Sequence, residues 1–169
     1  MKIIPKALAI ALSLFFAGSV IAEETKAPQW LFVHTAAAAE MTSENTLVMQ
    51  VAREIFAFTD RPNRLHAFLN THEFVSLWNE GNGDTFSADP PNAVLTWVEG
   101  NSVKEAEVVI TEAAPAEHGR FISYTVEVVV GAVPSALATA SLFVDGIDFC
   151  DLAIKMQILV CHKCILRCH

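Results

Sequence analysis

The alternation of side chains over residues 121–130 constrains the fold most strongly. In an extended chain every second side chain points the same way. The even-numbered positions of this stretch are all apolar or aromatic: Ile122, Tyr124, Val126, Val128 and Val130. The odd-numbered positions include Ser123, Thr125 and Glu127. This pattern predicts a β-strand whose even-numbered face packs on the core.

Further short segments rich in bulky and β-branched residues also predict strands. These segments are 30–35, 46–51, 54–59, 93–98, 103–111 and 141–145. The turn-forming residues at 60–63 and 99–102 come directly after the predicted strands 54–59 and 93–98 and are expected to form turns. The alanine run at 36–39 is compatible with a helix start, and 113–119 is expected to be a loop. The pattern predicts a mainly β fold, an antiparallel sandwich or open barrel.

One short helix is expected over Asn70–Asn79. Asn70 is suited to cap the helix, and Glu73 follows three residues later, as in a capping box. Phe74, Leu77 and Trp78 fall on one helical face. We expect this face to pack on the edge or mouth of the sheet.

The chain divides into three parts. Residues 1–22 combine Lys2 and Lys6 with an apolar run and a small-residue cut site, which is the pattern of a signal peptide. Residues 23–146 form a single β-rich domain, and 147–169 a tail rich in Cys and His that is either a genuine extension or an artefact of the gene end. We therefore expect a periplasmic or secreted protein with no transmembrane anchor after signal cleavage.

The charge composition disfavours certain classes of binding partner. The formal net charge is −8, and without the signal peptide 9 basic residues face 19 acidic ones, which gives about −10. An acidic body argues against nucleic acid, or an anionic membrane, as the main partner. All four cysteines lie at or after Cys150, so the domain contains no internal disulfide.

Three motifs occur in order along the chain. Residues 58–64 read Phe-Thr-Asp-Arg-Pro-Asn-Arg, 73–78 read Glu-Phe-Val-Ser-Leu-Trp, and 84–93 contain Asp-Pro-Pro-Asn-Ala. From Trp30 to Asp145 the chain resembles an uncharacterised family of exported bacterial proteins that share these motifs. The resemblance implies export but no activity, cofactor or substrate.

The turn at 60–64 and the loop at 84–92 are the candidate binding surface, since loops on a rigid sheet often carry binding. Their polar residues are Asp60, Arg61, Arg64, Asp84, Asp89 and Asn92. An arginine can bind a carboxylate or phosphate with two parallel hydrogen bonds. Alternatively, Arg61 or Arg64 pairs with Asp84 or Asp89 and only shapes the loop. In that case Phe86 and Trp78 are apolar plugs that tie the loop to the domain.

The tail offers a second candidate site. Cys161, Cys164, Cys168 and His169 place thiols and an imidazole within nine residues, a set that suits zinc or copper. A disulfide is the alternative for these cysteines. Outside the tail, His34, His66, His72 and His118 have no zinc-binding spacing.

The leading functional hypothesis is a non-enzymatic binding or envelope-associated module without a cofactor and with an unknown partner. The alternative is a metal-binding or thiol-redox protein that uses the tail. A hydrolase that uses Asp84 or Asp89 with a second acid is a third, weaker hypothesis.

Overall fold

The computed structural model describes residues 29–61, 64–79 and 85–146. These residues form eight strands, one α-helix and one 3₁₀ turn. In chain order the elements are β1 (Trp30–Ser43), β2 (Thr46–Gln50), β3 (Ile55–Thr59), β4 (His66–Leu69), α1 (Thr71–Asn79), β5 (Asn92–Glu99), β6 (Ser102–Ala116), η1 (Glu117–Gly119), β7 (Phe121–Val130) and β8 (Ala136–Val144). None of the helices in these ranges is long and apolar enough to cross a membrane.

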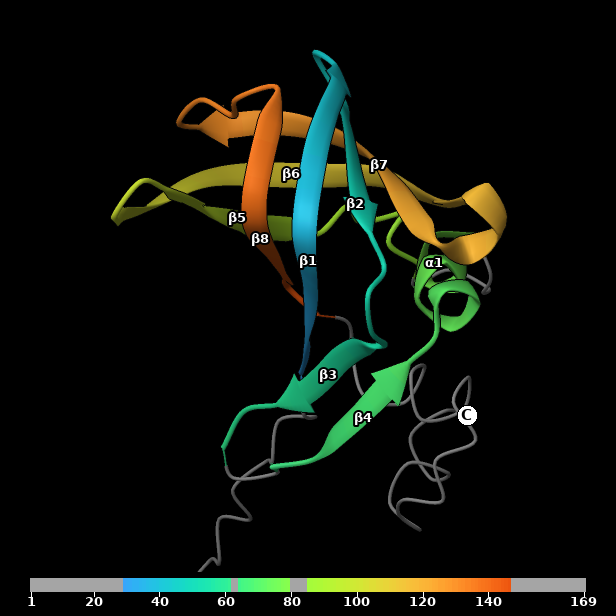
Figure 1. Cartoon of the computed structure of the whole chain (residues 1–169). Coiled ribbons are helices and arrows are strands. Elements are labelled where there is room, and N and C mark those ends of the chain that lie inside the picture. The colour runs from blue at the N-terminus through green and yellow to red at the C-terminus, as the bar shows by residue number, and fades with distance from the viewer. Residues whose placement is uncertain (1–28, 62–63, 80–84, 147–169) are drawn as a thin grey trace, which may run out of the picture.

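All eight strands belong to one antiparallel sheet. Its order is β2-β7-β6-β5-β8-β1-β3-β4, and an additional pairing of β2 with β1 closes six of the strands into a barrel. β3 and β4 continue the sheet outside the barrel and project away from it (Figure 1). The prediction of a mainly β fold with one short helix is confirmed, and of the two architectures expected the structure shows the barrel.

The long strand β1 belongs to both parts of the sheet. One edge pairs with β8 along most of its length. The other edge pairs with β2 from Ala39 to Ser43 and with β3 from Trp30 to Val33. The chain therefore leaves the barrel after β2, and β3 then pairs with β1 near the N-terminal end of that strand. We call residues 51–69, which include β3, β4 and their connecting turn, the wing.

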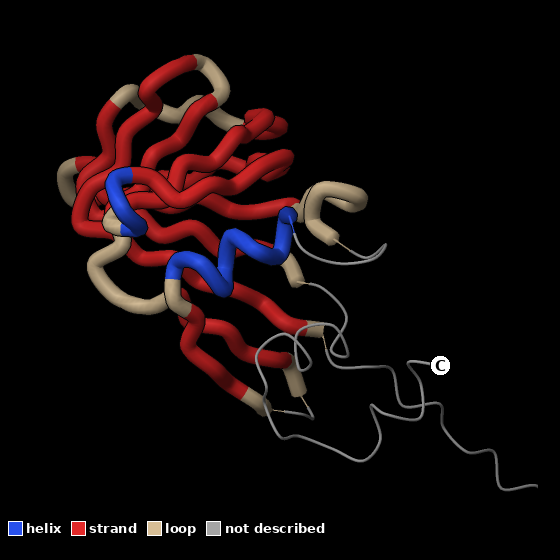
Figure 2. The backbone as a smooth tube through the Cα atoms, turned by 90° about the vertical axis from the view of Figure 1, so that its right-hand side faces the viewer, coloured by secondary structure: helices blue, strands red, loops and turns tan. Residues whose placement is uncertain are grey.

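Helix α1 packs at one end of the barrel and begins with the predicted capping box. The Asn70 backbone N–H donates to Glu73 Oε2 at 2.8 Å, and the Glu73 N–H donates to Asn70 Oδ1 at 3.0 Å. The predicted apolar face is confirmed, because Phe74, Leu77 and Trp78 are buried. Figure 2 shows α1 lying against the strands at this end.

Aromatic rings join α1 to the barrel interior. Phe74 lies 5.5 Å from Phe32 of β1 and 5.4 Å from Trp78, between ring centroids. Phe86 lies 4.7 Å from Trp78, and the Trp78 indole N–H donates to the Ile110 carbonyl at 3.2 Å. The predicted role of Trp78 and Phe86 as apolar plugs is therefore confirmed.

The structure corrects the last two positions of the predicted β7 core face. Ile122, Tyr124 and Val126 are buried as expected, but Val128 and Val130 are 37% and 53% exposed. β7 pairs with β2 only as far as Thr125. Near its end, the pairing of β7 with β6 shifts register, so that Val128 lies opposite Val108 but Val130 lies opposite exposed Glu107 and leaves the core face. The two valines therefore lie at the barrel rim.

The structure also decides two local segments. The alanine run at 36–39, which was compatible with a helix start, continues β1, because Ala36, Ala38 and Ala39 pair with β8 and Ala39 also pairs with β2. The expected loop at 113–119 begins late, since β6 runs to Ala116. β5 pairs with β6 only up to Val109, so Pro115 lies where β6 has a free edge and proline is tolerated.

Candidate functional site

The turn at 60–64 connects β3 to β4 at the tip of the wing. The Thr59 N–H donates to the Leu65 carbonyl, and the Leu65 N–H donates to Thr59 Oγ1, both at 2.9 Å. Thr59 is buried, and these two hydrogen bonds close the hairpin between β3 and β4. Asp60, Arg61 and Arg64 are all exposed around it. The two arginines are therefore free to meet a partner from solution.

The loop before β5 packs against α1 instead of against the wing. The Phe86 N–H donates to the Leu77 carbonyl at 3.0 Å, and the Asp89 N–H donates to the Thr85 carbonyl at 3.1 Å. The Asp89 side chain is exposed, and Asp84 lies outside the described residues. This hydrogen bonding holds the loop close to the end of the helix.

The structure does not bring the two predicted loops together. The 60–64 turn lies at the wing tip, whereas residues 85–91 lie beside α1 (Figure 1). Among the described residues the ion pair is Arg120 with Glu117 at 2.7 Å, so Arg61 and Arg64 do not pair with Asp89. The two loops therefore do not form one surface, and the wing must be considered separately.

Five apolar side chains form a continuous row on the outside of the sheet. Cross-strand pairs link Val94 to Phe143, Phe143 to Val33, Val33 to Phe56, and Phe56 to Phe68. Directly opposite residues of antiparallel strands share a face. Their neighbours Leu95, Leu142, Phe32 and Ile55 are buried, so the row faces outward. We call these five residues the apolar row; it crosses β5, β8, β1, β3 and β4.

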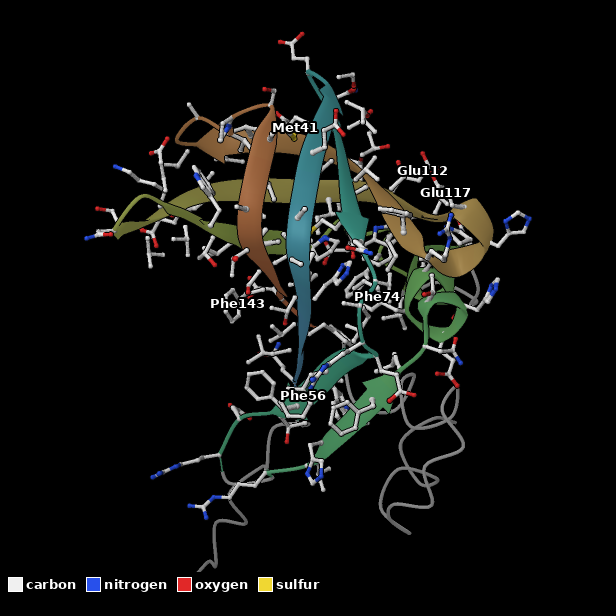
Figure 3. All side chains as sticks on the ribbon, in the orientation of Figure 1. Met41, Phe56, Phe74, Glu112, Glu117 and Phe143 are labelled. Atoms are coloured by element: carbon white, nitrogen blue, oxygen red, sulfur yellow. The ribbon has the colours of Figure 1, made fainter. Side chains whose placement is uncertain are left out.

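The apolar row is most aromatic on the wing. Phe56 stacks on Phe58 with ring centroids 5.6 Å apart and lies 5.2 Å from Phe68. Its ring is also 6.4 Å from that of His66. Phe68 is 57% exposed and Phe143 is also exposed. Figure 3 labels Phe56 on the wing and Phe143 on the barrel above it, with Phe74 beside α1.

A hollow of about 960 Å³ lies beside the wing end of the row. Val33, Phe56 and Phe68 form its apolar wall, and Arg53 and Glu54 line it as well. The hollow occurs where β1 changes partner from β2 to β3. It gives the aromatic surface a concave, partly charged border.

Asn92 lies at the opposite end of the apolar row. It begins β5 two residues before Val94, and both residues are exposed on the same face. Its backbone carbonyl accepts a hydrogen bond from the Asp145 N–H at 2.9 Å. Of the six residues predicted for binding, Asp60, Arg61 and Arg64 therefore lie at the wing tip, Asn92 borders the row, and Asp89 lies apart.

The barrel interior contains one polar pair, His34 and Tyr124. His34 Nδ1 lies 2.8 Å from the Tyr124 hydroxyl, and Nε2 lies 3.1 Å from the Gln50 carbonyl. The carbonyl only accepts, so Nε2 carries the proton and Nδ1 accepts from Tyr124. Burial lowers the pKa of His34 to about 4, although the hydrogen bond to Gln50 opposes this shift. Burial also raises the pKa of Tyr124. The pair is neutral and sealed from solvent, which indicates a structural role.

The proposed metal ligands Cys161, Cys164, Cys168 and His169 lie outside the described residues. Within the residues that are described, no group of three or more His, Cys, Asp or Glu side chains is arranged to hold a metal ion. Zinc or copper binding by the tail stays a prediction based on residue spacing.

The apolar row was missed by sequence reasoning. Its members come from five strands and become neighbours only through pairing register. A partial signal exists in Glu54–Thr59, where Phe56 and Phe58 alternate with buried Ile55, Ala57 and Thr59. That alternation places two aromatic rings on the face opposite the core.

Comparisons with protein-family models, curated proteins and solved structures find no match for this chain. The resemblance to exported bacterial proteins with the three motifs therefore stays a prediction.

Proposed function

We propose that this protein is an exported, non-enzymatic binding module that associates with the cell envelope through its wing. The observation that supports the proposal is the apolar row, which spans five strands and ends at exposed Phe68. Contiguous exposed apolar surface is typical of an interaction site, whereas isolated exposed apolar residues are not. Phe56 and Phe68 lie on β3 and β4, which project away from the barrel (Figure 1).

Binding agrees better than catalysis with the placement of the titratable side chains. His34 and Tyr124 use their polar side-chain atoms on each other and on Gln50, inside the barrel. Asp60, Asp89 and the wing arginines are exposed and belong to separate loops. A general acid and base must both reach one substrate. Among these described side chains, a hydrogen bond joins His34 to Tyr124, whereas no side-chain hydrogen bond or ion pair joins Asp60, Asp89 and the wing arginines to one another.

The proposal also gives a role to part of the predicted loop surface. Arg61 and Arg64 lie in the turn directly after β3, which carries Phe56 and Phe58. They place positive charge at the margin of the aromatic surface. An apolar surface with a charged margin is the usual anatomy of a binding site.

Cell fractionation tests the proposal. The full chain is produced in a Gram-negative host, and intact mass establishes whether residues 1–22 have been removed. We expect the exported protein in the envelope fraction, and we expect Phe68→Ser to move it to the soluble exported fraction. Val103→Ser is the control, because Val103 is 71% exposed in the barrel strand β6 and Phe68 is 57% exposed on the wing.

Thermal unfolding of both variants separates binding from folding. Both side chains are mostly exposed, so neither substitution should lower Tm appreciably. A wild-type protein found only in the soluble exported fraction would refute the proposal. The same conclusion would follow if Val103→Ser released the protein as completely as Phe68→Ser.

A further inference from the structure

We infer that the partner of the wing is the surface of an anionic lipid bilayer. This inference rests on the proposed function and specifies its partner. The first observation that supports it is the unequal distribution of charge between the wing and the rest of the described molecule.

The wing carries a small positive formal charge, whereas the rest of the described chain taken together is acidic. Residues 51–69 contain three arginines, Arg53, Arg61 and Arg64, and two acids, Glu54 and Asp60. The other described residues contain 2 basic and 11 acidic side chains. The formal charge is therefore +1 on the wing and −9 elsewhere. The net charge of the whole chain hides this segregation.

Because the wing is positive and the rest of the described molecule is negative, a negatively charged surface attracts the wing and repels the barrel. Phe32 of β1 marks the boundary between barrel and wing. On one side it pairs with Val144, where the pairing of β1 with β8 ends, and on the other side it pairs with Ala57 of the wing. The 60–64 turn begins three residues beyond Ala57, or roughly 10 Å along the strand. Glu40 lies eight residues from Phe32 in the other direction, roughly 26 Å away. Charges are screened beyond about 8 Å at physiological ionic strength.

A bilayer that touches the wing tip is therefore attracted by Arg61 and Arg64 and only weakly repelled by acids at the far end of the barrel. Four acids lie nearer and oppose this attraction. Asp60 is in the same turn, Glu107 is directly opposite Val94 of the apolar row, Asp145 follows β8, and Asp89 lies in the loop that leads to Asn92, the hydrogen-bond partner of Asp145. The approach is still more favourable through the wing than through the barrel. The expectation from overall composition counted against an anionic membrane and is not tested by the structure; the inference departs from it because it considers the charge of the wing separately.

The side chains of the wing also suit the bilayer interface. Phe56, Phe58 and Phe68 form one cluster of rings, with the His66 ring at its margin. Phenylalanine on one face and arginine on the other are typical of amphipathic helices that lie at the bilayer interface, and the wing combines the same residue types on a pair of strands. The long arginine side chains can bury their methylene groups while their guanidinium groups stay with the headgroup phosphates.

The test measures binding of the exported protein to vesicles by co-sedimentation. One set of vesicles contains equal amounts of phosphatidylglycerol and phosphatidylcholine, and the other contains phosphatidylcholine alone. We expect binding to the anionic vesicles only. Each arginine near an anionic surface contributes a factor of about 5, so the double variant Arg61→Ala/Arg64→Ala should bind about 30-fold more weakly.

The matched control is Lys104→Ala/Arg120→Ala, which removes the two basic residues described outside the wing. This control should bind like the wild type, whereas Phe68→Ser should lose most binding. Equal binding to both kinds of vesicle, or an equal loss in the control, would overturn the inference.

Two further outcomes separate this inference from the proposed function. If vesicles fail to bind while Phe68→Ser still leaves the envelope fraction in cells, the proposed function stands and the lipid partner is wrong. If light scattering shows a dimer that Phe68→Ser converts to a monomer, a second copy covers the wing and the lipid inference is overturned.

Discussion

The barrel and the wing use the same antiparallel sheet in opposite ways. The barrel curves the sheet so that its inner face is enclosed, and α1 covers one end with Phe74 and Trp78. The wing leaves its outer face open, with Phe56, Phe58 and Phe68 gathered there. Closure removes free strand edges, whereas an uncovered face with a terminal strand is suited to contact with other molecules.

The open face does not make the wing a separate folding unit. Its inner side chains Ile55, Ala57 and Leu69 belong to the same buried cluster as the barrel core. A single core therefore supports both the enclosed barrel and the exposed aromatic surface. The difference between the regions lies in which face is covered, and substitutions can measure it.

The largest expected effect contrasts two phenylalanines on either side of this boundary. Phe74→Ala removes a fully buried ring at the barrel end and should lower the free energy of unfolding by about 3–5 kcal/mol. Phe68→Ala removes a mostly exposed ring and should cost less than about 1 kcal/mol. Urea unfolding followed by circular dichroism measures both values. Similar losses for the two variants would mean that the wing face is covered in solution.

The second prediction concerns the sealed polar pair of the barrel. The pKa of His34 is about 4 in the folded protein, against about 6.5 in the unfolded chain. Between these values the unfolded chain binds more protons, so the free energy of unfolding falls as the pH falls. The loss reaches about 3 kcal/mol by pH 4, and His34 contributes no pH dependence above about pH 7.

Urea unfolding at a series of pH values isolates this contribution. Acidic residues also titrate in the same range, so the wild type is compared with His34→Gln, which should have a shallower slope between pH 6.5 and 4. His72→Gln removes an exposed histidine from α1 and serves as the control. If the His34→Gln slope equals that of the wild type, the barrel interior is open to protons and His34 is charged there.

The sequence was most informative where structure depends on neighbours along the chain. The capping box of α1 needs only Asn70 and Glu73, and the hydrogen bonds confirm both partners. The buried face of β7 was correct up to Val126 because period-two alternation is local. Local patterns could not show the register shift between β6 and β7, which places Val130 opposite exposed Glu107 instead of on the core face.

The candidate site was harder to predict because it depends on register. Turn chemistry identified Asp60, Arg61 and Arg64 in advance, but it could not place them far from Asp89. The apolar row joins residues as distant in sequence as Val33 and Phe143, which are direct partners across β1 and β8. β4, with four residues, was too short to predict, yet it carries Phe68. Single-strand patterns contain no information about such partners.

The smallest expected effect concerns the junction between wing and barrel. β4 ends at Leu69 and α1 starts at Thr71, so Asn70 is the single residue between them. Asn70→Ala removes the side-chain oxygen that accepts from the Glu73 N–H and should lower the free energy of unfolding by about 1 kcal/mol. Glu73→Gln should lose less, because glutamine also serves in a capping box.

His72→Ala, an exposed change in the same helical turn, is the control and should stay within about 0.5 kcal/mol of the wild type. The shape of the transition is as informative as its midpoint. Because Leu69 and Phe74 lie in one buried cluster, Asn70→Ala should unfold in a single transition with an unchanged urea m-value. A separate early transition would show that the wing unfolds independently, and the shared core would then not support the aromatic surface.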